Sequence, residues 1–223
     1  MLVLLSSGMV RGGPSFASHP LGITCRGRAA HVAAKTDKGV NALDALILFY
    51  QELKKLKQSF DRETILAGII TKGGTAPNII PAEAEADFTL RALTADYLEG
   101  SIVPAVRQLA DDVARQTGTT VTAVHYEPLY KELINDVRLM ALFRENMALL
   151  GEEVAVLAPD DADGSTDVGN VSHACPTIHP DIGMGCDAAA HTPAFAMAAD
   201  SAEARQRLLV GAKAMAMTAL DLL

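Results

Sequence analysis

The first half of the chain alternates between stretches of helical and of strand periodicity in its apolar residues. Residues 41–57 place apolar side chains on one helix face, and Asn41 stands where an N-cap belongs. Residues 98–116 repeat the helical pattern and precede Gly118, which suits the C-terminal end of a helix. Four other stretches are rich in β-branched residues or alternate between apolar and polar positions, as strands do. These predicted strands are residues 21–30, 64–71, 83–93 and 119–125.

This order of elements, strand–helix–strand–strand–helix–strand, is that of a ferredoxin-like βαββαβ sandwich. Two helices would cover one face of a four-stranded antiparallel sheet, and the other face would be free. We assign this domain to residues 19–130. The predicted fold class is therefore α/β, of the α+β kind.

The rest of the chain has a different character. Residues 1–10 are apolar without a preceding basic residue, so we interpret them as a buried strand rather than a signal peptide. We expect residues 1–18 and 131–223 to belong to a larger α/β domain whose first half is largely missing. The elements expected after Pro128 are a helix over 135–150, a strand over 154–157, an extended segment over 176–180 and a helix over 201–223.

Composition and charge exclude several classes of protein. Hydrophobic residues make up 49% and charged residues 21%, which is typical of a globular chain. The net charge of −8 argues against binding to nucleic acid or to an anionic membrane, and no run is long enough to span a bilayer. The three cysteines share no CxxC spacing, which favours a reducing, cytoplasmic compartment.

One loop and the strand after it suggest a receptor for a small acid. Asn78 lies in a Gly- and Pro-rich loop, residues 73–81, and Arg91 ends the following alternating strand. An amide and a guanidinium together can hold a carboxylate. The alternative is structural: Asn78 serves a turn, and Arg91 pairs with Glu83 or Glu85.

Two of the six histidines are candidates for chemistry. His31 follows small residues at a strand end, where it is either solvent-facing or a donor to a substrate oxygen. His191 lies in a loop of small residues, and Asp187 could orient it as a metal ligand. No HxxxH or HxH pair is present, so spacing alone does not support a metal site.

Ser165 and Thr166 lie in a loop rich in glycine and carboxylates. Either residue could cap the next helical turn. The alternative is that they form a wall of an active site, where they bind substrate or support a metal ligand. No GxSxG pattern surrounds Ser165, which argues against a nucleophile.

Several motifs follow one another in an order that resembles a known family. From about residue 19 to the C-terminus, the chain resembles the amidohydrolase branch of the zinc metallopeptidases of family M-twenty, which includes aminoacylases and carboxypeptidase-G type enzymes. Within that branch it is most similar to dipeptidases that act on β-alanyl and γ-aminobutyryl dipeptides with basic residues. The motifs are Gly27-Arg28-Ala29-Ala30-His31, Gly39-Val40-Asn41-Ala42-Leu43-Asp44-Ala45, Pro77-Asn78-Ile79-Ile80-Pro81 with Arg91, Gly164-Ser165-Thr166-Asp167, and His191-Thr192.

The resemblance implies a two-domain amidohydrolase that cleaves the amide bond of a small dipeptide or N-acyl amino acid. A catalytic α/β domain would bind one or two zinc ions, and the ferredoxin-like domain would be a lid that forms a homodimer. The resemblance further implies that His31 reaches the partner's active site and polarises the scissile carbonyl. Asn78 and Arg91 would hold the substrate carboxylate, and His191 would be a metal ligand.

The family's other metal ligands and its general-base glutamate are expected upstream of residue 19, where the sequence offers no counterpart. We therefore expect the isolated chain to be inactive unless another chain supplies these groups, because zinc hydrolysis needs about three protein ligands. The alternative function is a non-catalytic module that dimerises or binds a small carboxylate. A sensor of amino acids is a weaker alternative that rests on fold analogy alone.

Overall fold

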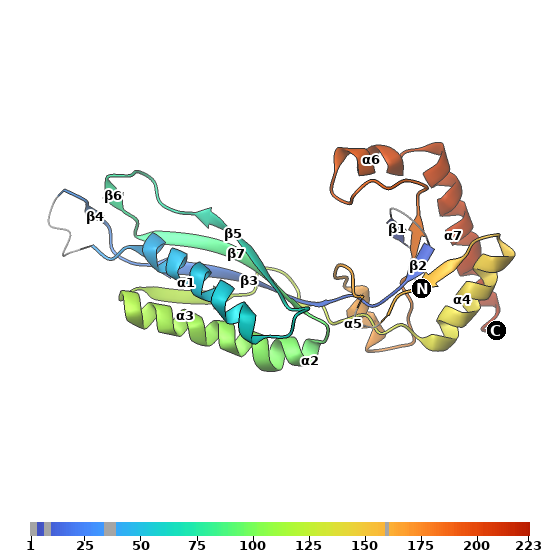
Figure 1. Cartoon of the computed structure of the whole chain (residues 1–223), viewed down its shortest axis with the longest axis horizontal. Helices are drawn as coiled ribbons and strands as arrows, with labels where there is room; N and C mark the ends of the chain where they lie inside the picture. Colours follow the sequence, from blue (N-terminus) through green and yellow to red (C-terminus); the bar gives the residue numbers. More distant parts are fainter. Residues whose placement is uncertain (1–3, 7–9, 34–38, 159–160) are drawn as a thin grey trace. The chain divides into compact units, whose positions relative to one another are not determined.

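The computed structural model describes residues 4–6, 10–33, 39–158 and 161–223. The chain forms two compact units, each with its own sheet and helices (Figure 1). We call Ala17–Tyr130 the central unit, and Met1–Phe16 with Lys131–Leu223 the flanking unit. Within the described residues, no helix is both long and apolar enough to cross a membrane.

The central unit is a 4-stranded antiparallel sheet with two helices on one face (Figure 1). Its strand order is β5-β7-β3-β8, and each neighbouring pair is antiparallel. This arrangement confirms the predicted ferredoxin-like sandwich and the α/β fold class. The elements are β3 (Ala17–Arg26), α1 (Ala42–Leu56), β5 (Ile65–Lys72), β7 (Glu83–Ala92), α3 (Val103–Thr117) and β8 (Thr120–Val124).

Strict alternation along β7 determines which face of the sheet carries the core. Every second residue from Ala84 to Ala92 is buried, and the residues between them are half-buried. Phe88 lies in this buried row, and its ring meets that of Phe49 from α1 edge-on at 5.5 Å between centroids. Because such an edge-to-face pair adds to the burial of both rings, α1 is anchored over the apolar face. The polar residues of β7 are left on the open face.

The ends of α1 and α3 follow from their capping residues. Asn41 Oδ1 accepts hydrogen bonds from the backbone N–H groups of Leu43 (3.0 Å) and Asp44 (3.3 Å), so the predicted N-cap is confirmed. Gly118 ends α3 with φ at 69°, in the left-handed region that favours glycine.

The helix predicted over residues 98–116 is not a single α-helix. It begins with a short α2 (Ala95–Tyr97) and a π-helical turn, η3 (Leu98–Ile102), before α3 starts. A π-turn adds a residue that hydrophobic periodicity does not reveal. This wider turn carries Glu99, whose Oε1 lies 2.6 Å from Nδ1 of the buried His19.

The strand β3 begins four residues earlier than the predicted 21–30, because its pairing with β7 continues to Ala17 opposite Ala92. It ends before Gly27, where a Cβ would lie 2.1 Å from the carbonyl oxygen of Val40. Glycine is therefore required for this close approach. Beyond it, β4 (Ala30–His31) and β6 (Ile79–Ile80) form a separate 2-stranded sheet, which we call the tip, and η2 (Lys57–Ser59) follows α1.

The flanking unit has a second 4-stranded sheet, in the order β1-β10-β2-β9. The pairs β1·β10 and β2·β9 are parallel, and β10·β2 is antiparallel. Its buried core includes Phe143 and Met147 of α4 and Ile182 of β10. The elements are β1 (Leu4–Ser6), β2 (Val10–Gly12), α4 (Val137–Leu149), β9 (Val154–Val156), α5 (Val168–Ser172), β10 (Asp181–Gly183), α6 (Pro193–Ala199) and α7 (Ala202–Leu220).

The two long helices and the strand β9 confirm the predictions for residues 135–150, 201–223 and 154–157. An extended segment was predicted over 176–180, whereas the strand in this region, β10, begins at Asp181. The predicted single strand over 1–10 is wrong: β1 and β2 are separate short strands, and residues 1–3 and 7–9 lie outside the described part of the chain.

Candidate functional site

The tip of the central unit brings His31 and Asn78 together. His31 pairs with Ile79 across β4 and β6, and the N–H of Val32 donates to the backbone oxygen of Asn78 at 3.1 Å. Both side chains are exposed. The Nδ1 atom of His31 accepts from the N–H of Ala33 at 3.1 Å, so in the neutral ring Nε2 carries the hydrogen. The tip therefore presents one ring N–H donor and one amide.

Arg91 lies at the opposite end of β7, between Ser18 of β3 and Ile65 of β5. Its side chain is half-buried, and its Nε has no hydrogen-bond partner among the described residues. A buried guanidinium nitrogen without a partner is costly unless a ligand supplies one. This position is therefore compatible with an anion-binding role.

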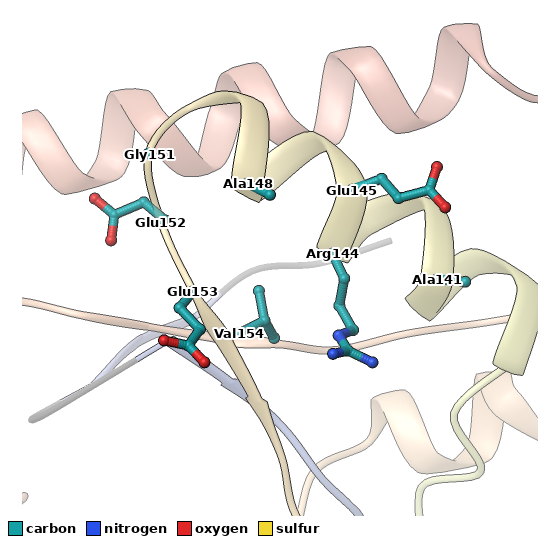
Figure 2. Close-up of a pocket in the computed structure, with 8 residues that line it drawn as sticks. All are labelled: Ala141, Arg144, Glu145, Ala148, Gly151, Glu152, Glu153 and Val154. Atoms are coloured by element: carbon teal, nitrogen blue, oxygen red, sulfur yellow. The ribbon is translucent and has the colours of Figure 1, made fainter.

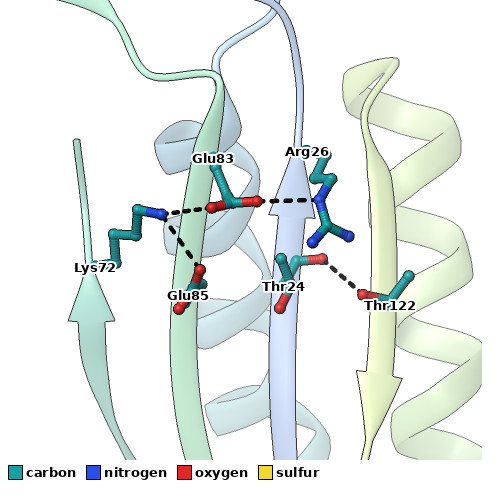
Figure 3. A network of polar contacts seen from close by, with 6 residues as sticks. All are labelled: Thr24, Arg26, Lys72, Glu83, Glu85 and Thr122. Atoms are coloured by element: carbon teal, nitrogen blue, oxygen red, sulfur yellow. Dashed lines mark hydrogen bonds and ion pairs between the residues drawn. The ribbon is translucent and has the colours of Figure 1, made fainter. Parts of the chain in front are cut away.

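The alternative pairing of Arg91 with Glu83 or Glu85 is wrong. Figure 3 shows that Lys72 contacts both carboxylates and that Glu83 also accepts a hydrogen bond from Arg26 Nε at 3.0 Å. On the same open face, the hydroxyl of Thr122 donates to the carbonyl oxygen of Thr24 at 3.4 Å (Figure 3).

Within one chain, the tip and Arg91 are too far apart to hold the same carboxylate. The strand β7 runs from Glu83, at the tip end, to Ala92, next to Arg91. A separation of eight strand residues corresponds to about 26 Å at ~3.3 Å per residue. The sequence placed Asn78 and Arg91 in one receptor, and a single copy of the central unit does not bring them together.

The flanking unit contains a cavity of about 750 Å³ that does bring predicted residues together. Ser165, Thr166 and His191 all line it. They come from the loop after β9 and from the turn before α6. The cavity also contains residues that the sequence analysis did not single out, notably Arg11 of β2 and His179.

Thr166 and Ser165 differ in their local contacts. The hydroxyl of Thr166 accepts a hydrogen bond from the N–H of Val168 at 3.3 Å, at the start of α5. Thr166 therefore has the structural, turn-closing role that was one of the two interpretations. The Oγ of Ser165 is buried and has no partner within the described residues. Only Ser165 therefore retains an uncommitted polar atom.

His191 has φ at 63°, and it is the non-glycine residue with positive φ in the described part of the chain. A left-handed backbone in such a residue costs about 1–2 kcal/mol. The next residue, Thr192, caps α6 by accepting from the N–H of Phe195 at 3.2 Å. A strained, exposed imidazole at a cavity is a frequent feature of functional sites.

The described residues do not by themselves fit a complete metal site. They contain no group of three or more His, Cys, Asp or Glu side chains placed to hold a metal ion. His191 would contribute a single ligand, whereas a zinc site needs about three or four protein ligands.

An ion-pair cluster beside the cavity was missed by the sequence analysis. Arg11 Nε donates to Asp181 Oδ2 at 3.0 Å, and its Nη2 donates to Asp163 Oδ2 at 2.6 Å. Burial raises the pKa of Asp181, and the hydrogen bond from Arg11 opposes this shift. Burial lowers the pKa of His179, whose Nε2 has no partner among the described residues. No sequence signal links these residues, because they come from three distant segments.

A second hollow lies on the outer side of α4 and has a volume of about 570 Å³ (Figure 2). Its charged side chains, such as Arg144 and Glu145, point in different directions (Figure 2). Glu152 is already paired with Arg207. Because no buried orphan polar atom of the described residues lines this hollow, the cavity beside Ser165 is the better candidate site.

The chain is similar in sequence to a peptidase domain family and to curated dipeptidases. Residues 18–117 match the family model of the peptidase dimerisation domain. The chain is 38% identical to a Xaa-Arg dipeptidase of Mus musculus over 219 residues, which cover 94% of this chain and 49% of that protein. The Xaa-Arg dipeptidase of Homo sapiens is 35% identical over 94% of this chain and 48% of its own length. The chain thus spans about half the length of the curated relatives it matches.

Solved structures show the same fold. A putative aminohydrolase from methicillin-resistant Staphylococcus aureus has a TM-score of 0.72 at 19% identity, covering 98% of this chain and 58% of its own. An amidase of the hydantoinase/carbamoylase family from Burkholderia phymatum has a TM-score of 0.69 at 14% identity, covering 99% and 53%. The resemblance inferred from the motifs is thereby confirmed: the chain is a relative of the M-twenty peptidases, and its residues 18–117 belong to their dimerisation-domain family.

Proposed function

We propose that this chain is part of a metal-dependent amidohydrolase of the dipeptidase type. Such an enzyme cleaves the amide bond of a small dipeptide or N-acyl amino acid. One observation carries the proposal. The match to the mouse Xaa-Arg dipeptidase extends over 94% of the chain, so it includes both the dimerisation domain and the unit with the cavity. A protein that only dimerised would not need the flanking unit with its cavity.

The central unit would form a homodimer and hold the substrate across it. In one chain, the strand rise places Glu83, at the tip end of β7, about 26 Å from Arg91, so Asn78 at the tip and Arg91 are well separated. They can therefore serve one carboxylate only if the tip of one chain meets Arg91 of another. In that arrangement, Arg91 contributes a planar fork for the carboxylate, and Asn78 donates from its amide. The Nε2–H of His31 would donate to the scissile carbonyl oxygen and stabilise the negative charge that develops there.

The metal would be zinc, with His191 as one ligand. When bound, zinc activates a water molecule for attack on the amide carbonyl. The described residues do not complete the zinc site. We therefore assign no zinc-dependent step of the reaction to residues of this chain. Ser165 and Thr166 would line the substrate side of the same cavity.

A cytoplasmic location is part of the same proposal. Cys25, Cys175 and Cys186 are all free thiols. Free cysteines suit a reducing compartment.

The second candidate is a non-catalytic module that dimerises or binds a small carboxylate. It is favoured by the family model that matches, because this model describes the dimerisation domain alone. A dimer that binds glycyl-L-arginine without hydrolysing it, with zinc present, would support this candidate over the first.

The experiment that tests the proposal mixes two variants. Asn78→Ala and Arg91→Ala are each expected to abolish tight binding of glycyl-L-arginine, because each removes one side of every shared carboxylate site. When the two variants are mixed and allowed to exchange subunits, about one quarter of the sites should be intact, since random pairing gives half heterodimers with one good site each. Calorimetric titration measures this fraction. No recovery in the mixture would contradict a site shared between two chains.

A further inference from the structure

Two buried polar atoms without partners lie on side chains that line one cavity of the flanking unit. Leaving such atoms unpaired destabilises a fold, so a ligand is an expected partner for those that face a cavity. Ser165 and His179 both line the cavity of about 750 Å³. The buried side-chain atoms without a partner among the described residues are His19 Nε2, Thr64 Oγ1, Arg91 Nε, Ser165 Oγ and His179 Nε2.

The guanidinium of Arg11 contacts both of the segments that carry these atoms. Arg11 binds Asp163 at 2.6 Å, and Asp163 precedes Ser165 by two residues. Arg11 also binds Asp181 at 3.0 Å, and Asp181 follows His179 by two residues. Both contacts join residues more than 150 positions apart in the sequence. The side chain of Arg11 therefore links the segment of Ser165 to that of His179.

The backbone adds to this positioning on both sides. Asp181, two residues after His179, pairs with Arg11 where β10 meets β2 in the sheet. The carbonyl oxygen of Gly164 accepts from the N–H of Phe16 at 2.9 Å, and the N–H of Asp163 donates to Pro14 O at 3.3 Å. The segment of His179 has a further link, in which its own N–H donates to Asn135 Oδ1 at 3.4 Å. The side chain of Arg11 contacts both segments.

The chemistry of the two atoms suits an uncharged polar group. Burial lowers the pKa of His179, so its imidazole is neutral near pH 7 and has one N–H donor and one acceptor. The Ser165 hydroxyl can likewise donate or accept. An amide group, with a C=O and an N–H, complements such a pair without bringing a charge into the cavity.

We propose that Ser165 and His179 form a hydrogen-bonding pair for an amide group of a bound dipeptide, and that Arg11 is the positioning residue that holds the two in register. This inference deepens the proposed function and rests on it. His179 then contacts substrate directly, whereas Arg11 acts through the two segments it joins.

The test compares two replacements of His179 in the full chain, with glycyl-L-arginine as the probe in calorimetric titration. His179→Leu removes both ring nitrogens and should weaken binding about tenfold, the equivalent of one lost hydrogen bond. His179→Gln keeps an N–H close to the position of Nε2 and should remain within about threefold of the original chain. Arg205→Gln is the control, because Arg205 pairs with the exposed Asp200 and does not line the cavity.

A second measurement does not depend on the probe. Because His179 Nε2 has no partner among the described residues, His179→Leu should leave the thermal unfolding temperature unchanged or raise it. A clear drop would show that the ring is held by the protein itself and would overturn the inference. This outcome is independent of whether any dipeptide binds.

The positioning role of Arg11 is tested by a double-mutant cycle. Arg11→Gln should weaken dipeptide binding in the original chain and have little further effect in the Ser165→Ala/His179→Leu background. Equal effects in both backgrounds would show a purely structural role. Unchanged binding in His179→Leu would overturn this inference and leave the proposed function intact. Absence of dipeptide binding by the original chain would contradict the proposed function.

Discussion

The two units of this chain differ in how they are held together. Among the described residues, the central unit has a core cluster of 20 buried hydrophobic residues, and its sheet strands are 5 to 10 residues long. In the part of the flanking unit whose burial is described, the buried cluster has 7 hydrophobic residues, and each strand of this unit has 3 residues. Because buried apolar area is the main source of stability, the described residues lead us to expect the central unit to be the more stable of the two.

The flanking unit replaces apolar burial with polar links between distant segments. Arg11 joins two loops through Asp163 and Asp181. Asn146 of α4 donates to Thr218 Oγ1 at 3.2 Å and to Asp221 Oδ2 at 2.7 Å, at the end of α7. Such contacts fix geometry around a cavity but add less stability than a large core. The chain therefore combines a unit with a large apolar core and a unit in which polar contacts between distant segments have a larger part.

The largest expected effect comes from the core of the central unit. Phe88 is 2% exposed and packs on Phe49, so Phe88→Ala should lower the free energy of unfolding by about 3–5 kcal/mol. Tyrosine fluorescence in urea measures this selectively, because all four tyrosines lie in the central unit and the chain has no tryptophan. A loss below about 1 kcal/mol would contradict a single continuous core.

The second effect tests the polar links of the flanking unit. Asn146 is 4% exposed, and Asn146→Ala removes both of its hydrogen bonds, which should cost about 1–3 kcal/mol. Circular dichroism follows the helices α4 and α7, whereas tyrosine fluorescence should not change. Gln206→Ala, at an exposed position of α7, is the matched control and should have almost no effect. Equal effects of the two substitutions would show that the link to α7 contributes nothing.

The central unit was predictable from sequence because its signals are local. The apolar period of α1, the capping Asn41 and the alternation of β7 all lie within single elements. The misplaced start of β3 arose because pairing with β7 continues through Pro20, which propensity disfavours inside a strand. The π-turn η3 was also not predicted, because one inserted residue does not disturb the wider helical pattern.

The candidate sites were less predictable because they are assembled by tertiary contacts. Motif resemblance found Ser165 and His191, and the structure places both at one cavity. Neither His179 nor Arg11 carries a sequence signal, because their roles depend on contacts between strands far apart in the chain. The sequence also could not show that β7 separates Asn78 from Arg91.

Matched helix caps give a smaller effect in each unit. Asn41 caps α1 in the central unit, and Asp136 caps α4 in the flanking unit by accepting from Leu139 N–H at 2.8 Å. Alanine at either position should cost about 1 kcal/mol, because each removes one capping acceptor. Tyrosine fluorescence should detect only Asn41→Ala, and circular dichroism both. A fluorescence change in Asp136→Ala would show that the two units unfold together.

The smallest expected effect is a loss of unfolding free energy in the central unit below neutral pH, caused by the buried His19. His19 is 1% exposed, and its ring lies 4.0 Å from that of His125. Burial lowers the pKa of His19 below its usual 6.5; Glu99 opposes this shift, and His125 and Arg107 reinforce it. The unfolded chain therefore binds a proton on His19 at a higher pH than the folded protein does.

It follows that His19 leaves the free energy of unfolding unchanged above pH 6.5 and lowers it as the pH falls below that value. Urea unfolding followed by tyrosine fluorescence between pH 7.5 and 5 measures the loss. His19→Gln should flatten this dependence, and a slope that persists in this variant would assign it to other groups. In Glu99→Gln the folded pKa of His19 should fall further, so the loss of stability should continue to lower pH. The part of the circular-dichroism transition that occurs without a change in tyrosine fluorescence reports on the flanking unit, and neither substitution should shift it.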